Sequence, residues 1–412
     1  MRKAAVINTC VSGSTGKIAS GLAEYLNNIG YDTVFCFGRE NGEVKVEHYR
    51  IGSKADLLFH VLLTRLTGLQ GYGSRRATKK LIKYLINRSV DTVFIISLHG
   101  YYLNEKLFLD YLAESGVKVV YIMVDEYAFL GKCPYNFDCE RYKNGCAKCP
   151  RKKDYPSSFF LSGASVIYKM KEKEYPKLRD VTFVGPEYVV LRAKDSPLMA
   201  GARFAVLDEA IDTDLFSPQD ASDLLAELGI DERKIVLIDV ARYSDERKGC
   251  KYFLELAKRM ESNDDYVFIH VGFDGKQSRS ELPKNFIPVG FIKDQKMLAK
   301  YYSVGDLLIF TSLEDTMPNT CLEALSVGTP VMCFDISGMP YIGDETVATF
   351  VEVGNVDEME RYVLSMKKKD EQKKAVCRRY ALKRYDNKMY FKKIVCIVDG
   401  KSVGEGEDND TF

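Results

Sequence analysis

The chain has 412 residues, which is more than one ordinary hydrophobic core supports, so the length predicts two domains of roughly 200 residues each. Hydrophobic residues make up 46% of the sequence, and 59 Lys and Arg face 58 Asp and Glu. A net charge of +1 gives no nucleic-acid signature. We see no signal peptide and no apolar run of membrane-spanning length, which predicts a cytoplasmic protein.

Strands and helices alternate through the first half. Residues 3–9 form an apolar run, a Gly/Ser-rich turn follows, and apolar residues at helical spacing predict a helix over 18–29. Further short strands are predicted at 34–37, 92–97, 117–124 and 181–184. This alternation predicts a parallel sheet covered by helices, that is, a Rossmann-like domain over residues 1–205.

The second half repeats this pattern. Residues 206–218 lack helical periodicity and predict a crossing between domains, and a new alternating set predicts a Rossmann-like domain over 219–380. We expect a closing helix over 381–399. Residues 400–412 are rich in Gly and acids, which predicts a disordered tail.

Two carboxylates follow the strand predicted at 307–310. Asp315 falls in the loop beyond its carboxyl end, and Glu323 falls near the start of the next helix. Ligands of α/β proteins bind at such ends, where a carboxylate accepts hydrogen bonds from sugar or ribose hydroxyls. The alternative is a helix cap at Asp315 and a solvated Glu323.

Two cations follow the first strand of the second domain. Arg242 and Lys248 lie in a strand-to-helix loop, where they would grip the phosphates of a nucleotide diphosphate and stabilise a phosphate leaving group. The alternative is a solvated charged loop.

A glycine-rich turn follows the first strand of the chain. Gly13, Ser14 and Gly16 open a helix, an arrangement in which backbone amides approach a ligand. Val11 and Ile18 occupy positions where a P-loop needs Gly and Ser or Thr, which excludes a P-loop NTPase. A tight turn without a ligand is the alternative.

Four cysteines cluster in the first half: Cys133, Cys139, Cys146 and Cys149. Four thiolates at this spacing suit a structural zinc site. Two disulfides are the alternative, which a reducing compartment disfavours.

Polar and aromatic residues also follow two strands of the first domain. His99, Asp125 and Glu126 at neighbouring strand ends predict the floor of a sugar site, whereas each of them taken alone is better explained as a cap. Residues 54–88 combine an apolar stripe with basic residues, which suits peripheral contact with an anionic membrane or a solvated basic face.

Several segments together resemble a known family. The carriers are NTCVSGSTGKIA, LHGYYLN, the cysteine segment, DERKG, PVGFIKDQKMLAKYYS and SLEDTMPNTCLEALSVGTPV. They are similar to the retaining GT-B glycosyltransferases of family 4 (group 1), in particular the capsular and exopolysaccharide branch. The resemblance implies two Rossmann-like domains facing a central cleft, with a C-terminal helix packing back towards the N-terminal domain.

The resemblance also implies roles. A nucleotide diphosphate sugar would be the donor, a glycan or lipid-linked molecule the acceptor, and no catalytic metal would be needed. Arg242 and Lys248 would neutralise the diphosphate, Glu323 would bind the ribose and Asp315 the donor sugar, with Asn319 and Thr320 in the same donor-binding segment. Gly13, Ser14 and Gly16 would line the cleft, and Asp125 would lie at the reaction centre.

The chain departs from the family pattern at several positions. Val124 stands where a histidine is usual before Asp125, and Tyr127 and Tyr188 stand where Trp is usual. On the resemblance as a whole, the prediction is a retaining glycosyltransferase of surface polysaccharide synthesis. The alternative is a catalytically impaired GT-B protein that binds nucleotide sugar or a partner within a polysaccharide assembly.

Overall fold

A computed structural model describes residues 1–39, 42, 44–368 and 370–401, which form two compact units. Unit 1 contains Met1–Asp208 and the residues from Lys388 onward, and unit 2 contains Glu209–Asn387. The predicted disordered tail lies almost wholly outside the described residues. No helix in the described ranges is both long and apolar enough to cross a bilayer.

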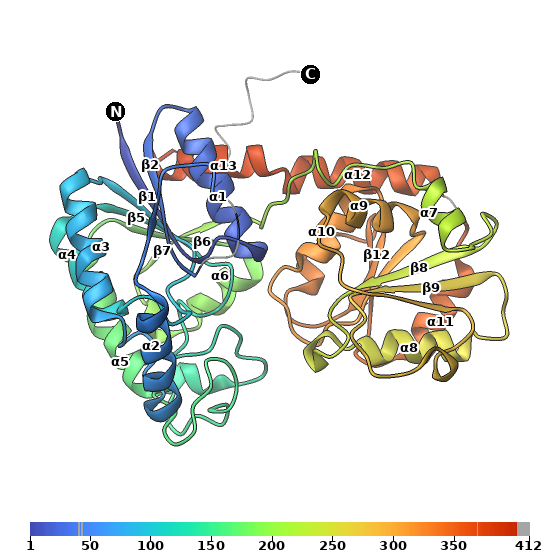
Figure 1. Ribbon diagram of the computed structural model, residues 1–412, viewed down its shortest axis with the longest axis horizontal. Helices are drawn as coiled ribbons and strands as arrows, with labels where there is room; N and C mark the ends of the chain where they lie inside the picture. Colours follow the sequence, from blue (N-terminus) through green and yellow to red (C-terminus); the bar gives the residue numbers. More distant parts are fainter. Residues whose placement is uncertain (40–41, 43, 369, 402–412) are drawn as a thin grey trace. The chain divides into compact units, whose positions relative to one another are not determined.

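Unit 1 is a seven-stranded parallel sheet in the order β3-β2-β1-β4-β5-β6-β7, with helices on both faces (Figure 1). The six inner residues of β1 are all buried, as expected for a parallel strand covered on both faces. Its strands are β1 (Lys3–Cys10), β2 (Asp32–Arg39), β3 (His48–Arg50), β4 (Thr92–Ile95), β5 (Lys118–Ile122), β6 (Val181–Gly185) and β7 (Arg203–Val206). Its helices are α1 (Gly13–Asn28), α2 (Lys54–Thr67), α3 (Arg75–Arg88), α4 (Glu105–Ser115), α5 (Ala164–Glu174) and α6 (Glu187–Lys194).

Unit 2 is a six-stranded parallel sheet in the order β10-β9-β8-β11-β12-β13, again between helices (Figure 1). Its strands are β8 (Ile235–Val240), β9 (Tyr266–Val271), β10 (Phe286–Val289), β11 (Leu307–Phe310), β12 (Val331–Phe334) and β13 (Ala348–Val351). Its helices are α7 (Ser222–Glu227), α8 (Cys250–Arg259), α9 (Gln295–Val304), α10 (Asn319–Ser326), α11 (Val356–Ser365) and α12 (Glu371–Tyr385). The prediction of two parallel-sheet α/β domains is confirmed.

The strand order reverses once in each sheet. The reversal falls between β1 and β4 in unit 1 and between β8 and β11 in unit 2. Chain segments leave opposite sides of the sheet at such a point, which opens a crevice at the carboxyl ends of the two strands. The sheet topology therefore designates one place in each unit where a ligand is expected.

Two helix boundaries differ from the predictions. Helix α1 begins at Gly13 and not at residue 18, because Gly13 and Gly16 take part in its first turn despite their low helix propensity. The predicted closing helix over 381–399 is two helices, the end of α12 and α13 (Asn387–Val398). Asp386 interrupts them, because its extended backbone pairs with Ile211.

Helix α13 packs on unit 1. The ring of Phe391 lies 5.7 Å from that of Tyr25, and it occupies the space beside Gly21 of α1. Arg2 also forms an ion pair with Asp399 just beyond the helix. The expected return of the C-terminal helix to the N-terminal domain is therefore observed.

Candidate active site

The crevice of unit 2 brings together the loops that follow β8 and β11. Lys248 Nζ lies 2.8 Å from Asp315 Oδ2, and Arg247 Nη1 lies 3.3 Å from the same oxygen. Arg247 Nη1 also donates to the backbone oxygen of Glu314 at 2.7 Å. The predicted pair Lys248 and Asp315 thus meets in space, although 67 residues separate them in sequence.

The sequence analysis assigns phosphate binding to Arg242 and Lys248 and does not include Arg247. Arg242 does not join this cluster; its side chain is 75% exposed and its guanidinium approaches Asp274 at 3.9 Å. Arg247 instead has a side chain only 23% exposed. Adjacent cations in the DERKG segment were the available signal, but sequence order does not reveal which of them turns towards β11.

Hydrogen bonds join the two loops to each other. Leu313 N donates to Arg247 O at 2.8 Å, and Thr311 Oγ1 donates to Gly249 O at 2.9 Å. Gly249 has a φ of +63°, and a Cβ there would lie 2.0 Å from Thr311 O. Only glycine permits this close approach, so the position of Lys248 beside Asp315 depends on Gly249.

Helix α10 begins directly after this cluster. Its first residue is Asn319, and Thr320 Oγ1 lies 3.5 Å from Val240 O at the end of β8. Glu323 is almost buried, and its Oε2 accepts a hydrogen bond of 2.9 Å from Tyr302. All three predicted donor-binding residues of this segment therefore lie in the first turns of α10, near the cation cluster.

A cavity of about 310 Å³ lies at the carboxyl ends of β8, β9 and β10. Its walls include Arg242 and Asp274 as well as the apolar residues Phe273, Ile292 and Leu298. Such a mainly apolar cavity with a few polar groups suits a flat heterocycle that continues into an anionic group.

The crevice of unit 1 holds a histidine and a carboxylate. His99 Nε2, in the loop after β4, lies 2.7 Å from Asp125 Oδ2, in the loop after β5. His99 Nδ1 lies 3.3 Å from Tyr155 Oη, and Tyr127 N donates to Asp125 Oδ1 at 2.9 Å. Burial raises the pKa of Tyr155, which keeps its hydroxyl protonated near neutral pH. The predicted proximity of His99 and Asp125 is observed.

Glu126 does not belong to the exposed floor predicted for this site. Its side chain is fully buried; Oε1 lies 2.7 Å from Arg192 Nε, and Oε2 accepts from Asn136 N at 2.6 Å. The carboxylate anchors the segment that follows β5, because a buried charge requires partners. Val124 and Tyr127 are likewise buried.

The glycine turn after β1 has an accessible part and a closely packed part. Gly13 has a φ of +80°, a Cβ added there would meet no atom within 4 Å, and Ser14 is exposed. A Cβ on Gly16 would instead lie 2.4 Å from the backbone of Val11. Gly13 and Ser14 therefore remain accessible to a ligand, whereas Gly16 is required for packing.

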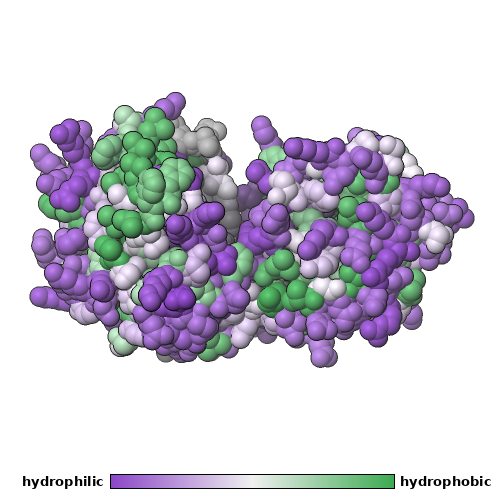
Figure 2. Space-filling model, turned by 90° about the horizontal axis from the view of Figure 1, so that it is seen from below, coloured by the Kyte–Doolittle hydropathy of each residue, from purple (hydrophilic) through white to green (hydrophobic). Residues whose placement is uncertain are grey.

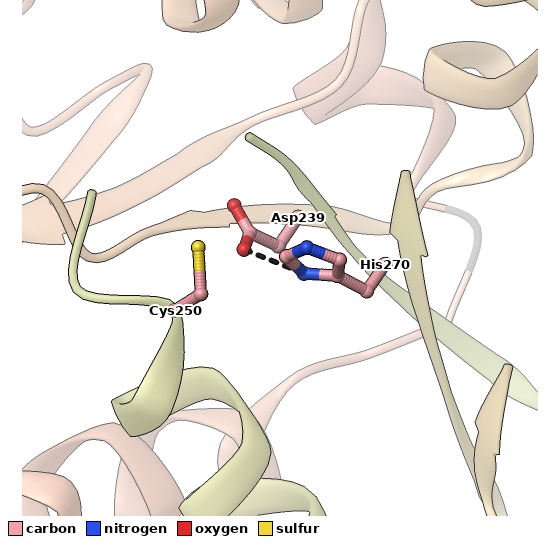
Figure 3. Close-up of side chains that lie close together, drawn as sticks. All are labelled: Asp239, Cys250 and His270. Carbon is pink, nitrogen blue, oxygen red and sulfur yellow. Dashed lines mark ion pairs between the residues drawn. The ribbon is translucent and has the colours of Figure 1, made fainter. Parts of the chain in front are cut away.

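Sequence reasoning also missed a buried cluster of Asp239, His270 and Cys250 (Figure 3). Asp239 and His270 are direct partners on β8 and β9, with His270 Nδ1 2.9 Å from Asp239 Oδ2. Burial raises the pKa of the Cys250 thiol, so it stays protonated. A polar residue at the same depth of two apolar strands, IVLIDV and YVFIHV, was the available signal.

The remaining predicted ligands, Cys133, Cys139, Cys146 and Cys149, lie in unit 1 between β5 and α5. They line a cavity of their own.

The whole chain is similar to solved glycosyltransferase structures. The Anabaena protein Alr3699/HepE in complex with UDP superposes with a TM-score of 0.65 at 14% identity, over 97% of this chain and 100% of that one. WaaG, a glycosyltransferase of lipopolysaccharide biosynthesis, gives a TM-score of 0.64 at 14% identity, over 96% and 100%. The fold is GT-B. At such identities the likeness establishes the fold of this GT-B chain and nothing of its substrates.

Sequence comparison finds a family match within unit 2. Residues 234–368 match the family model "Glycosyl transferases group 1". The putative colanic acid biosynthesis glycosyl transferase WcaC of Escherichia coli K12 is 27% identical over 249 residues, which is 57% of each chain. D-inositol 3-phosphate glycosyltransferase of Geodermatophilus obscurus is 26% identical over 33% of this chain and 34% of its own length. The chain thus spans 57% of the length of the first relative and 34% of that of the second.

Proposed function

We propose that this GT-B protein is a retaining glycosyltransferase that moves a sugar from a nucleotide diphosphate donor to a glycan or lipid-linked acceptor in surface polysaccharide synthesis. The match of unit 2 to group 1 glycosyl transferases and the WcaC relative support the reaction class. Complexes of the structural neighbour HepE with UDP and with UDP-glucose support the donor class.

The observation that carries the proposal is the cation cluster at the unit 2 crevice. Lys248 and Arg247 converge on Asp315 at the carboxyl ends of β8 and β11, and the N-terminus of α10 follows at once. Cations beside a helix N-terminus make a site for phosphate oxygens. Positive charge there also stabilises the diphosphate as it leaves.

The proposed roles divide the donor along this crevice. Lys248 and the exposed Arg242 bind the diphosphate, and Glu323 accepts hydrogen bonds from the ribose hydroxyls. The cavity beside Arg242 takes the base, since its apolar walls suit a flat ring. Asp315, held by Lys248, accepts from hydroxyls of the transferred sugar.

Unit 1 takes the acceptor in this proposal. The His99–Asp125 pair offers an imidazole and a carboxylate to hydroxyl groups, and the accessible backbone at Gly13 and Ser14 lies after β1 of the same crevice. His99 supports an active enzyme, because it supplies an imidazole beside Asp125 although Val124 replaces the usual histidine. Phosphate-stabilising cations take the part that a metal plays in other transferases, so the reaction requires no catalytic metal.

The proposal is tested by incubating the purified protein with a panel of UDP-, GDP- and dTDP-sugars and candidate acceptors. We expect sugar transfer with retained anomeric configuration in the product, measured by NMR. Glu323→Ala should raise the KM for the donor, whereas Glu255→Ala, on the exposed face of α8, should not. Donor binding without transfer to any acceptor would favour a catalytically impaired binding subunit, and an inverted product would exclude the retaining mechanism.

A hydrophobic surface on unit 1 supports contact with an anionic bilayer (Figure 2). It joins the outer face of α2 to the segment before α5, since Phe159 N donates to Arg65 O. Its exposed apolar residues are Leu58, Phe59, Leu62, Leu66, Phe159, Phe160 and Leu161. Lys54 and Lys153 are exposed on the same two segments and supply positive charge.

The structure changes which part of residues 54–88 would touch lipid. The stretch is two helices. Helix α3 buries Ala77, Leu81 and Leu85 and exposes Ile86, whereas the outer face of α2 exposes Leu58, Phe59, Leu62 and Leu66. Phe59→Asp and Phe160→Asp should reduce sedimentation with phosphatidylglycerol vesicles, whereas Leu364→Asp, an exposed position of unit 2, should not. Sedimentation that is unaffected by the unit 1 changes would exclude this surface.

A further inference from the structure

The segment between β5 and α5 is long, irregular and nevertheless closely packed. It runs from residue 123 to residue 163, and its regular structure is a single 3-10 turn at Glu140–Asn144. Irregular stretches longer than about 15 residues are uncommon in compact domains unless something holds them together. Two lysines with fully buried side chains, Lys132 and Lys171, belong to or contact this segment. We therefore expect a cross-link, covalent or through a metal ion, within residues 123–163.

Four cysteines of this segment surround one small cavity. Cys133, Cys139, Cys146 and Cys149 all line a space of about 20 Å³, and each is a half-buried free thiol. That volume is close to the roughly 10–15 Å³ that a single water needs. The cavity thus has room for one ion and for little else.

We infer that Cys133, Cys139, Cys146 and Cys149 bind a structural zinc ion that holds the segment between β5 and α5. Four cysteine ligands fill all positions of a tetrahedral site, which leaves none for catalysis. The four sulfurs line the cavity, but among the described residues no three of them lie within 4.8 Å of one another. Zinc–sulfur distances of about 2.3 Å mean that the ion draws them inward.

Backbone geometry already directs amides towards these sulfurs. The Arg151 amide donates to Cys149, and the Gly131 amide donates to Cys146. Cys146 and Lys148 adopt left-handed backbone conformations with φ of 54° and 49°, which turn the chain tightly between the last two cysteines. N–H donors stabilise negatively charged sulfur, the form that coordinates a metal.

Buried positive charge complements the site. Four thiolates and one divalent ion carry a net charge of −2 by arithmetic, and this charge needs compensation inside the protein. Lys132 Nζ donates to the carbonyls of Lys152 and Pro156 at 3.1 and 2.9 Å and lies beside Cys133 and Cys149. Lys171 contacts Leu130 O at 3.1 Å and is shared with Glu105 at 3.9 Å.

A disulfide is the rival arrangement, and its partners are identifiable. The thiols of Cys133 and Cys149 interact with each other, so these two would be the first to pair. Such a bond would leave Cys139 and Cys146 without a role. A zinc ion uses all four.

The ion would also fix the candidate sugar site of unit 1. Tyr155, six residues after Cys149, places its hydroxyl 3.3 Å from His99 Nδ1. This consequence rests on the proposed function, but zinc binding itself does not.

The test uses the full chain, expressed in zinc-supplemented medium and purified under reducing conditions without a histidine tag. We expect one zinc per chain by elemental analysis, and loss of zinc with a lowered Tm after treatment with a strong chelator. Cys139→Ser should lose most of the zinc, whereas Cys396→Ser, a half-buried cysteine of α13, should keep it. Absence of zinc from the reduced protein would overturn the inference.

A second measurement does not depend on the folding of any variant. Co²⁺ added to the chelator-treated protein should produce the sulfur-to-metal charge-transfer bands and visible d–d bands of a tetrahedral thiolate site. Retention of those bands in Cys396→Ser supports the assignment to the cluster. An intact Cys133–Cys149 disulfide in mass spectra of freshly isolated protein, or a featureless Co²⁺ spectrum, would reject it.

Discussion

The two crevices use the same topology with different chemistry. Each lies where its sheet order reverses, and each places an acid against a basic side chain: Asp125 with His99 in unit 1, Asp315 with Lys248 in unit 2. In unit 2 a second cation, Arg247, joins the pair. In unit 1 the additional neighbours are the aromatic rings of Tyr127 and Tyr155.

Under the proposed function, this difference would separate the two substrates of the transfer reaction. Permanent cations near a helix N-terminus suit phosphates, whereas an imidazole, a carboxylate and aromatic faces suit a neutral sugar. A common topology therefore determines where each site lies, and the side chains on its loops determine which ligand it takes.

Replacing Lys248 of the unit 2 crevice should have the largest effect on sugar transfer. Lys248→Ala should lower kcat/KM for transfer by about 100-fold to 1,000-fold, because the departing diphosphate loses one positioned positive charge. The measurement is steady-state kinetics with varied donor. Lys251→Ala, an exposed lysine on the next helix, serves as the control; equal activity in both variants would contradict the placement of the diphosphate.

The next largest effect, on stability, is expected from the buried pair Asp239 and His270 of unit 2. Asp239→Asn should lower the free energy of unfolding by about 3 kcal/mol, because it leaves the fully buried His270 beside a neutral amide. Urea unfolding measures this. Asp274→Asn, with a side chain 44% exposed, should change stability little, and a loss of equal size there would show that burial is not the cause.

Unit 1 also contains a buried histidine, His60, and its burial predicts that the stability of the protein depends on pH. Burial lowers the pKa of His60 to about 4, from an ordinary value of 6.5. Between these values the unfolded chain binds more protons than the folded one, so stability falls as pH drops from 6.5 towards 4, by about 2 kcal/mol. His60→Gln should flatten this part of the profile of unfolding free energy against pH. His48→Gln, at an exposed position, should leave it unchanged.

The smallest effect is expected at the unit 1 crevice. His99→Phe should lower kcat/KM about 10-fold, equivalent to about 1.4 kcal/mol, because the Asp125 carboxylate loses the hydrogen bond that orients it. We expect the change in the KM for the acceptor and not for the donor. A change in the KM for the donor alone would contradict the assignment of His99 to the acceptor.

Much of the fold and part of the site followed from the sequence. Continuous apolar runs such as residues 307–310 identify buried parallel strands, and the loops after them identify Lys248 and Asp315 as candidates. Sequence did not separate Arg242 from Arg247, because both lie in one charged loop and only the approach of the β11 loop distinguishes them. It also took Glu126 for a surface acid, because a buried partner such as Arg192 comes from a distant helix.

By itself, then, the sequence determined the alternation of strands and helices, the two Rossmann-like domains and the loops that carry polar residues. Periodicity and turn residues are local properties, and they suffice for such predictions. The tertiary structure alone decided that Lys248 meets Asp315, that His99 meets Asp125, and that Asp239 and His270 form a buried pair. Each of these depends on strand order, which brings residues far apart in the chain to the same edge of a sheet.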